Sequence, residues 1–357
     1  MITFDNVTKV HPNGTTAVKD LNLTVEEGSI TVFVGPSGCG KTTSLRMINK
    51  MTDPSEGRVI VNGEDIADVD PVSHRLGIGY VIQHAGLLPH RSVLDNVAQV
   101  LRLKKVPKDK ARAAARDAIE RVRLAPELAD RYPAQLSGGQ QQRVGVARAL
   151  AADPPILLMD EPFSAVDPVT RDDLQNEVLR IQKDLKKTVV IVTHDIDEAL
   201  RLGDKIAVFA RGGVVQQYAA PETLLTRPAN EEVEQFIGRD RGFRALSFQP
   251  ALRFPDGREI SVEPLGEAAD GARQAPEGWR LAVGADGSAE SWVAEDGDTF
   301  PVGTVASLEG GSLRSTLDSV LSSPGPFGLV VDGEDRPVGT VASQDVFELV
   351  DDKAGVR

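Results

Sequence analysis

The stretch Gly35–Thr42 holds the residues best suited to chemistry, because it follows the pattern G-x-x-x-x-G-K-T. Its glycines let the backbone curl tightly and point N–H groups inward, where they bind phosphate oxygens. The helix expected from about Lys41 adds the positive end of its dipole. We expect Lys41 to reach the β- and γ-phosphates of a nucleotide and the Thr42 hydroxyl to bind Mg²⁺. A chance match in a glycine-rich loop is the alternative, and the β-branched run Ile30–Val34 before the loop disfavours it.

An acidic pair, Asp160 and Glu161, follows the apolar run Ile156–Met159. Such an unbroken run is typical of a strand buried on both faces, and the carboxyl ends of these strands form the ligand-binding edge of an open α/β sheet. We therefore expect Asp160 to hold Mg²⁺, directly or through water. Glu161 would orient and deprotonate an attacking water as general base. The alternative is a solvated acidic turn, which Pro162 would suit.

Two further polar residues come at the ends of predicted strands. His194 follows Thr188–Thr193, and Gln83 follows Ile78–Ile82. The position of His194 favours a contact with the γ-phosphate, although a lone histidine at a sheet rim is often only a satisfied structural residue. Gln83 would bind Mg²⁺ or its water through the amide oxygen, with a plain surface glutamine as the alternative.

The stretch Leu136–Gln140 predicts a second kind of anion site. Ser137 is a good N-cap, and Gly138 and Gly139 leave bare amides at the start of a helix. Apolar residues at helical spacing give that helix a buried face. They are Val144, Ala147, Leu150 and Ala151. The start of this helix is therefore an anion site with no phosphate motif of its own.

In this order, the motifs resemble the nucleotide-binding subunit of an ATP-binding-cassette (ABC) transporter, over Met1 to about Gly238. The resemblance implies an α/β cassette with a helical subdomain at about 88–153. It also implies a homodimer that sandwiches two ATP molecules, with Ser137–Gln140 of one copy gripping the γ-phosphate bound to the other. Mg²⁺ would be held by Thr42, Gln83 and Asp160, and Lys41, Glu161 and His194 would be catalytic.

The resemblance also assigns a full set of nucleotide-binding residues. His11 stands where the family usually has an aromatic residue that stacks on adenine, and Val166 replaces a usual leucine just before Asp167. The complete set is His11, Gly35, Pro36, Ser37, Gly38, Cys39, Gly40, Lys41, Thr42, Thr43, Gln83, Ser137, Gly138, Gly139, Gln140, Asp160 and Asp167.

Within this family the sequence is similar to subunits of osmoprotectant importers, which carry quaternary amines such as glycine betaine, carnitine and choline. The stretches that carry this likeness are Gly77–Gln83, Gly86–His90, Val93–Asn96, Arg131–Pro133, Met159–Phe163 and Phe236–Arg241. Two alternatives stay open. One is an importer ATPase for an amino acid, a polyamine or an anion, and the other is a soluble ABC ATPase with no role in transport.

The composition of the chain limits the kinds of partner that it can bind. No run approaches about 18 consecutive apolar residues, and no secretion signal is evident, so we expect a peripheral protein on the cytoplasmic face of the membrane. Integral membrane permease subunits would dock on the loop after Gln83, Gly86–His90, whose apolar residues we expect to be exposed, with an ordinary buried loop anchor as the alternative. An extracytoplasmic solute-binding protein would be an indirect partner. The net charge of −13, with no basic stripe, argues against nucleic acid.

Beyond Gly238 the chain contains an internal repeat at an offset of 48 residues. Trp279–Val283 aligns with Phe327–Val331, and Trp292–Ala294 with Thr340–Ala342. Each copy predicts a strand, an acidic turn and a strand, with a short helix before them, and two such units should pair to bury a core. Residues 299–351 resemble a cystathionine-β-synthase (CBS) domain and residues 244–298 a degenerate one. We therefore expect a small α+β tandem CBS module, with a structural or dimerising role at least as well supported as ligand sensing.

Overall fold

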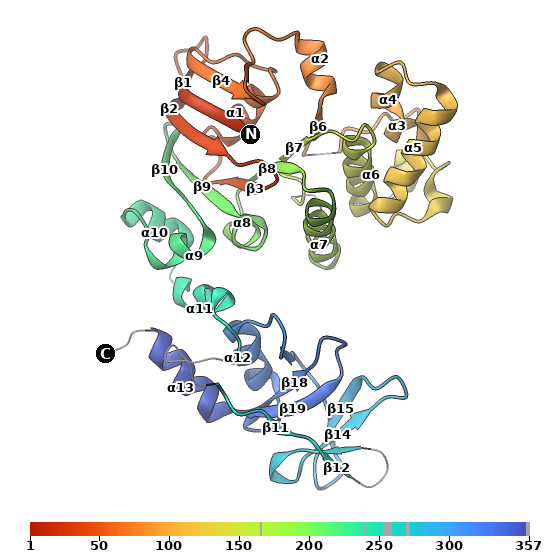
Figure 1. Ribbon diagram of the computed structural model, residues 1–357, viewed down its shortest axis with the longest axis vertical. Coiled ribbons are helices and arrows are strands. Elements are labelled where there is room, and N and C mark those ends of the chain that lie inside the picture. The colour runs from red at the N-terminus through yellow and green to blue at the C-terminus, as the bar shows by residue number, and fades with distance from the viewer. Residues whose placement is uncertain (84, 165, 239, 253–258, 269–271, 355–357) are drawn as a thin grey trace. The chain divides into compact units, whose positions relative to one another are not determined.

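A computed structural model describes residues 1–83, 85–164, 166–238, 240–252, 259–268 and 272–354. The chain forms two compact units, Met1–Ile237 and Gly238–Arg357. Figure 1 shows the helices and strands of each unit. None of the helices in these described ranges is long and apolar enough to cross a membrane.

A six-stranded mixed sheet forms the centre of the first unit (Figure 1). Five of its strands run parallel, and the edge strand β10 is antiparallel to β9. The three central strands are buried at every residue, as their β-branched and aliphatic runs predict. In spatial order the strands are β10 (Val214–Ala219), β9 (Lys205–Ala210), β3 (Ile30–Val34), β8 (Thr188–Thr193), β7 (Ile156–Asp160) and β6 (Ile78–Val81).

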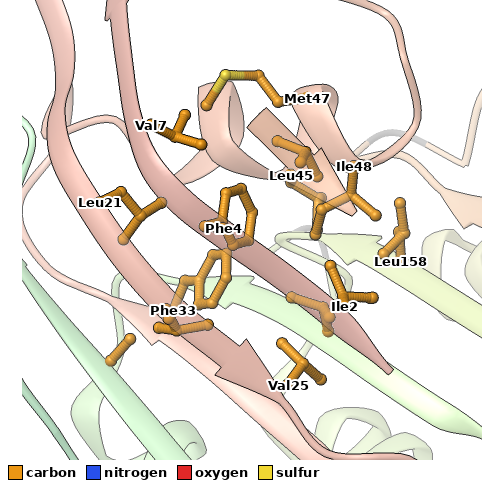
Figure 2. Packing of buried hydrophobic residues seen from close by; sticks show 14 of the residues in the cluster. Ile2, Phe4, Val7, Leu21, Val25, Phe33, Leu45, Met47, Ile48 and Leu158 are labelled. Carbon is orange, nitrogen blue, oxygen red and sulfur yellow. The ribbon is translucent and has the colours of Figure 1, made fainter. Parts of the chain in front are cut away.

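A second, antiparallel sheet packs over this one. It consists of β2 (Thr16–Val25), β1 (Ile2–Val10), β4 (Glu56–Val61) and β5 (Glu64–Asp65). The apolar core lies between the two sheets and includes the inner face of α1 (Lys41–Ile48). Figure 2 shows Phe4 of β1 next to Phe33 of β3, and their ring centroids are 6.3 Å apart. This packing fixes the start of α1, and with it the phosphate loop, against the central strands.

Helices complete the first unit. Figure 1 shows α7 and α8 on the side of the mixed sheet away from β1, β2 and β4, and a group of helices beside β6. That lateral group consists of α3 (Val93–Val97), α4 (Gln99–Leu103), α5 (Lys108–Arg121), the 3₁₀ turns Pro126–Leu128 and Pro133–Gln135, and α6 (Gly138–Leu150). The others are α2 (Pro71–Leu76), α7 (Pro168–Leu185), α8 (Ile196–Leu202), α9 (Pro221–Thr226) and α10 (Glu231–Ile237).

Two small sheets make up the second unit. The first has the order β11-β19-β18-β17 and packs on helices through a cluster that includes Val330, Val341 and Leu317. Its elements are α11 (Arg241–Ala245), the 3₁₀ turn Leu246–Phe248, β11 (Glu263–Pro264), β17 (Ala306–Ser307), α12 (Leu313–Ser322), β18 (Phe327–Val331), β19 (Pro337–Ala342) and α13 (Ser343–Ala354).

The second sheet of this unit is a five-stranded antiparallel meander. Its core combines Leu281 and Trp292 with Phe327 and Leu329 of β18. The strands, in spatial and chain order, are β12 (Gly266–Glu267), β13 (Arg273–Gln274), β14 (Arg280–Val283), β15 (Ala289–Val293) and β16 (Thr299–Pro301).

The hairpins β14–β15 and β18–β19 have the same register at the 48-residue offset seen in the sequence. Leu281 pairs with Trp292 as Leu329 pairs with Thr340, and both ladders are irregular at the corresponding position. The expectation that the copies pair is confirmed, because both contribute to the core around Trp292.

The two copies differ in their helices. Helix α12 precedes β18, as expected, whereas among the described residues only the 3₁₀ turn Pro276–Gly278 directly precedes β14. The short helix predicted before the first hairpin is therefore wrong. Strands β12 and β13 occupy this part of the chain instead, and they extend the meander through tight turns.

Candidate functional site

The phosphate loop owes its shape to glycines at two points of close backbone approach. At Gly35 a Cβ atom would lie 2.2 Å from the carbonyl oxygen of Phe209, and at Gly40 it would lie 2.1 Å from that of Ala17. Gly40 also has φ of 100° at the N-cap of α1. Since a side chain fits at neither position, the loop must have glycine at both to reach this shape.

Lys41 lies inside this loop. Its side chain is buried, and Nζ donates to the carbonyl oxygens of Gly35 at 2.7 Å and Pro36 at 2.9 Å. The Sγ atom of Cys39 lies 3.6 Å from the same ammonium. Burial raises the pKa of the Cys39 thiol, and the positive charge of Lys41 opposes that rise. The loop therefore has a positive charge at its centre, which can attract an anion.

Thr42 and Asp160 meet at the carboxyl end of β7. The Thr42 hydroxyl donates to Oδ1 of Asp160 at 2.8 Å. Asp160 is buried, and this burial raises the pKa of its carboxyl while the hydrogen bond from Thr42 lowers it. The two residues predicted to share a role are therefore brought together from positions 118 residues apart.

Glu161 contacts two of the other predicted residues, Gln83 and His194. Its Oε2 accepts a hydrogen bond from Nε2 of Gln83 at 3.1 Å and lies 3.3 Å from Nδ1 of His194. Glu161 itself has φ of 46°, a left-handed conformation that non-glycine residues rarely adopt. Its backbone N–H donates to the carbonyl of Val192 at 2.9 Å. Such strain persists only where the surroundings impose it, and it is typical of functional sites.

Parallel strands explain why these residues converge. The phosphate loop follows β3, Asp160 and Glu161 lie at the end of β7, His194 follows β8, and Gln83 follows β6. The carboxyl ends of parallel strands share one edge of the sheet, where α/β proteins bind ligands.

Ser137 and Gln140 form a capping box at the start of α6. The Ser137 hydroxyl accepts from the backbone N–H of Gln140 at 3.3 Å, and Oε1 of Gln140 accepts from the backbone N–H of Ser137 at 3.0 Å. Within the described part of the chain, we find no hydrogen bond between Ser137–Gln140 and the phosphate loop, Asp160 or Glu161. The hydrogen bonds of this stretch in the described residues are therefore local to the start of α6 and the turn before it.

The other predicted positions lie in loops or near the start of a helix. His11 lies in the turn between β1 and β2, where its backbone N–H donates to Thr15. Ser37 and Gly38 are exposed, Thr43 is half-buried on α1, and the carbonyl of Asp167 accepts from the N–H of Arg171. Ala165, beside Asp167, and Arg239, within Phe236–Arg241, lie outside the described residues.

The loop Gly86–His90, expected to carry exposed apolar residues, is held by two polar side chains. Arg148 donates to the carbonyls of Ala85 at 2.5 Å and Gly86 at 2.7 Å. The buried Asn96 accepts from the N–H of Leu88 at 2.7 Å and donates back to its carbonyl at 3.1 Å. Leu87 and Leu88 are half-buried, so the expected exposure of these two leucines is wrong, and the exposed residues of the loop are Gly86, Pro89 and His90.

Sequence reasoning missed Arg148, Asn96 and three residues beside His194: Arg171, Thr193 and Glu198. These last three line a cavity of about 70 Å³ together with Glu161, Ser164, His194 and Asp195. A signal for Glu198 was present in the sequence. Asp195 followed three residues later by Glu198 has the spacing of a helix N-cap and its N3 acidic residue.

The family model for the ABC transporter matches residues 18–164. Among curated proteins, the chain is 49% identical over 247 residues to the choline transport ATP-binding protein OpuBA of Bacillus subtilis. The aligned residues cover 69% of this chain and 65% of that relative. It is 50% identical over 241 residues to the glycine betaine/carnitine/choline transport ATP-binding protein OpuCA of the same organism. This alignment covers 68% of the chain and 63% of the relative. The chain thus spans less than two thirds of the length of these two relatives.

A shorter relative is covered more fully. The glycine betaine uptake system ATP-binding protein YehX of Escherichia coli is 50% identical over 270 residues, with 74% of this chain and 87% of the relative covered. Among solved structures, the ATP-binding cassette MJ0796, a dimer bound to ADP and Pi, is 35% identical with a TM-score of 0.57. That match covers 62% of this chain and 99% of the cassette. The predicted cassette fold and family are both confirmed, and the chain belongs to the ABC transporter family.

Proposed function

We propose that this chain is the ATP-hydrolysing subunit that energises import of a quaternary-amine osmoprotectant, of the glycine betaine, carnitine and choline class. The observation that carries the ATPase part is the contact of Glu161 with both Gln83 and His194, next to the Thr42–Asp160 pair. The solute class rests on relatives at about half identity that are named for choline, carnitine and glycine betaine transport.

ATP binds first through its phosphates. The backbone N–H groups of Gly38–Thr42 and the positive end of α1 surround the β-phosphate. Lys41, now held by two loop carbonyls, exchanges at least one of them for phosphate oxygens. His11, Ser37, Thr43 and Asp167 complete the nucleotide-binding set that we propose.

The residues around the phosphate loop fit Mg²⁺. This ion prefers oxygen ligands and is commonly held by only one or two protein groups in addition to phosphates and water. Thr42 and Asp160 offer a hydroxyl and a carboxylate already within 2.8 Å of each other, and Gln83 adds an amide oxygen. When bound, Mg²⁺ neutralises charge on the β- and γ-phosphate oxygens.

Hydrolysis requires a water in line with the bond between the γ-phosphorus and its bridging oxygen. Glu161 orients this water and accepts its proton as the new bond from oxygen to phosphorus forms. The bond to the bridging oxygen breaks, and ADP leaves with the electron pair. His194 contacts the γ-phosphate, and Lys41 stabilises the charge that develops on it.

The site requires a second copy of the chain. Ser137–Gln140 form a helix start suited to an anion, and the hydrogen bonds described for them do not include the phosphate loop, Asp160 or Glu161 of their own chain. In a two-fold dimer they cover the γ-phosphate bound to the other copy. The dimeric state of the related cassette MJ0796 supports this arrangement.

Transport requires separate membrane subunits, which we place on the loop Gly86–His90. Arg148 and Asn96 hold this loop to the lateral helices that also carry Ser137. ATP-driven closure of the dimer thereby moves the loop and switches the permease subunits between outward and inward access. The chain would act peripherally on the cytoplasmic face, with an extracytoplasmic solute-binding protein as an indirect partner.

For the second unit, we propose a CBS-like domain at residues 299–351. Its order of strand, helix, two antiparallel strands and helix, with β17 parallel to β18, supports this assignment. The meander of residues 266–301 has another architecture, so the proposal does not extend to the first copy.

Uptake of labelled glycine betaine tests this function, with choline and proline as competitors, in cells without other osmolyte importers. The cells express this chain with its membrane subunits as wild type, as Glu161→Gln, or as the exposed control Glu222→Gln. We expect Glu161→Gln to keep ATP binding and to lose about 10²–10⁴-fold in turnover, and uptake with it, because the general base is gone.

Wild-type turnover in Glu161→Gln would contradict the ATPase assignment. Normal ATP hydrolysis without uptake of any quaternary amine would contradict the solute class alone.

A further inference from the structure

Glu198 is a buried carboxyl group beside the site to which the mechanism gives no role. It lies on α8, one turn after His194, with 7% of its surface exposed. Its Oε2 accepts a hydrogen bond from the Thr193 hydroxyl at 2.6 Å. Burial raises the pKa of this carboxyl, and the hydrogen bond from Thr193 lowers it. A carboxyl kept in a costly environment next to a reactive centre indicates a specific role.

The hydrogen bonds of Glu198 continue to the other side of His194. The Thr193 hydroxyl has one proton, which it donates to Glu198, and it accepts the backbone N–H of Asp195 at 3.1 Å. Thr193 and Asp195, the residues directly before and after His194, are thus both linked to the carboxylate of Glu198 through the Thr193 hydroxyl. Asp195 in turn caps α8 by accepting from the N–H of Asp197 at 2.8 Å, which anchors this turn to the helix.

His194 depends on this anchoring because its side chain has little packing of its own. The side chain is 61% exposed, and within the described residues its hydrogen-bonding or ionic contact is with Glu161 at 3.3 Å. An exposed imidazole keeps a fixed direction only if its backbone is fixed. The distance between His194 and Glu161 is therefore set by the turn 193–195.

Glu198 itself is not placed to react. Its Oε2 accepts the hydrogen bond of the Thr193 hydroxyl, and Glu161, not Glu198, has the contact with His194. Arg171 faces the same small cavity and lowers the pKa of Glu198, although burial has the larger effect in the opposite direction. These observations leave Glu198 a role that acts through its neighbours.

We propose that Glu198 is a positioning residue of the hydrolysis site. Through Thr193 and Asp195 it fixes the backbone on both sides of His194 and so sets the contact between His194 and Glu161. This inference rests on the proposed ATPase function, and it adds a residue that the phosphate loop, acidic pair and histidine motifs do not contain.

Steady-state ATP hydrolysis by the purified full chain tests the proposal. Glu198→Ala and Thr193→Val each remove the link, so we expect kcat to fall by about 10-fold or more, with KM for ATP within about threefold, because only the alignment of the reacting groups is lost. Glu198→Gln and Thr193→Ser keep an oxygen acceptor and a hydroxyl, and they should retain at least about a third of the wild-type kcat.

The double variant His194→Ala/Glu198→Ala separates positioning from a general structural effect. If Glu198 acts through His194, its loss has no further effect on kcat once His194 is gone. An equal fall in both backgrounds would overturn the proposal. So would a wild-type kcat in Glu198→Ala, or a Glu198→Gln variant as impaired as Glu198→Ala.

A second measurement does not depend on turnover. In protein with ¹³C-labelled histidine, the imidazole signals of His194 are identified by their absence in His194→Ala. They should shift or broaden in Glu198→Ala and Thr193→Val, and stay in place in Glu198→Gln. Unchanged signals in the first two variants would overturn the positioning role, whereas a wild-type chain that does not hydrolyse ATP would overturn the proposed function alone.

Discussion

The two units of this chain use their sequences in different ways. The first brings residues from four distant stretches to the carboxyl ends of parallel strands, where single side chains such as Glu161 join several motifs. The second repeats one hairpin at a distance of 48 residues and places it in two different surroundings. The hairpin β18–β19 contributes to two cores, whereas β14–β15 contributes to one.

The structure of each unit therefore depends on a different feature of its sequence. In the first, the parallel sheet brings the predicted site residues together, and we propose that the identity of these few residues decides function. In the second, burial decides which face of each hairpin packs into a core. Substitutions should therefore affect turnover in the first unit and local stability in the second.

The largest effect should come from mixing two inactive chains. Lys41→Ala removes the ammonium of the phosphate loop, and Gly139→Asp places a carboxylate at the proposed anion site of α6. Each variant alone should lose at least about 10²-fold in ATP turnover, since a main electrostatic contact to phosphate is gone. A mixture should recover at most roughly a quarter of the wild-type sites, because about half of the dimers are mixed and each has one intact site.

Turnover of the mixture is measured against each variant alone at the same total concentration. A mixture no more active than its components would contradict the composite site, and it would also remove the contrast between the two units.

The next effect tests the second unit. Trp292→Ala should destabilise this unit by about 3–5 kcal/mol, because a fully buried indole is replaced by a cavity. Its partner across the ladder, Phe300, is 39% exposed and is the matched control. Calorimetry of the full chain should show a lowered transition for Trp292→Ala and a smaller change for Phe300→Ala, with ATP turnover at low temperature unaffected.

A loss of turnover in Trp292→Ala that exceeds the unfolded fraction would contradict the separation of roles. It would show that the second unit acts on hydrolysis even while the first unit remains folded.

Much of the first unit could be predicted from sequence because its signals are local and physical. The runs Ile30–Val34 and Thr188–Thr193 are strands buried at every residue, and the residues after them lie at one sheet edge, as predicted. The family assignment is confirmed by relatives at about half identity. The roles of the site residues remain predictions, as does the partner copy that Ser137–Gln140 require.

What the sequence did not reveal depends on tertiary contacts. Asn96 and Arg148 bond backbone carbonyls, and any residue has a carbonyl, so no partner motif marks them. In the second unit, the repeat predicted the register of both hairpins but not the strands before the first. Strands β14 and β15 contribute Leu281 and Trp292 to the core but leave Glu290 exposed and Arg280 and Ser291 only half-buried, a one-sided burial that is typical of antiparallel sheets.

The smallest expected effect is a difference in stability between substitutions at one equivalent turn position of the two repeat copies. Gly287 and Asp335 lie 48 residues apart in matching turns, with φ of 86° and 59°, and each N–H donates to the carbonyl three residues before it. Gly287→Ala should cost about 1 kcal/mol, since a Cβ would meet nothing closer than Arg336 Cδ at 3.6 Å and only the left-handed backbone opposes it. Asp335→Gly should change the stability by less than about 0.5 kcal/mol, because Asp tolerates this conformation and glycine makes the unfolded chain more flexible. The two values are compared by calorimetry of the full chain. Equal and opposite changes would mean that backbone strain alone sets the stability of both turns, whereas the expected asymmetry means that each copy has adapted its turn residue to the same backbone by a different route.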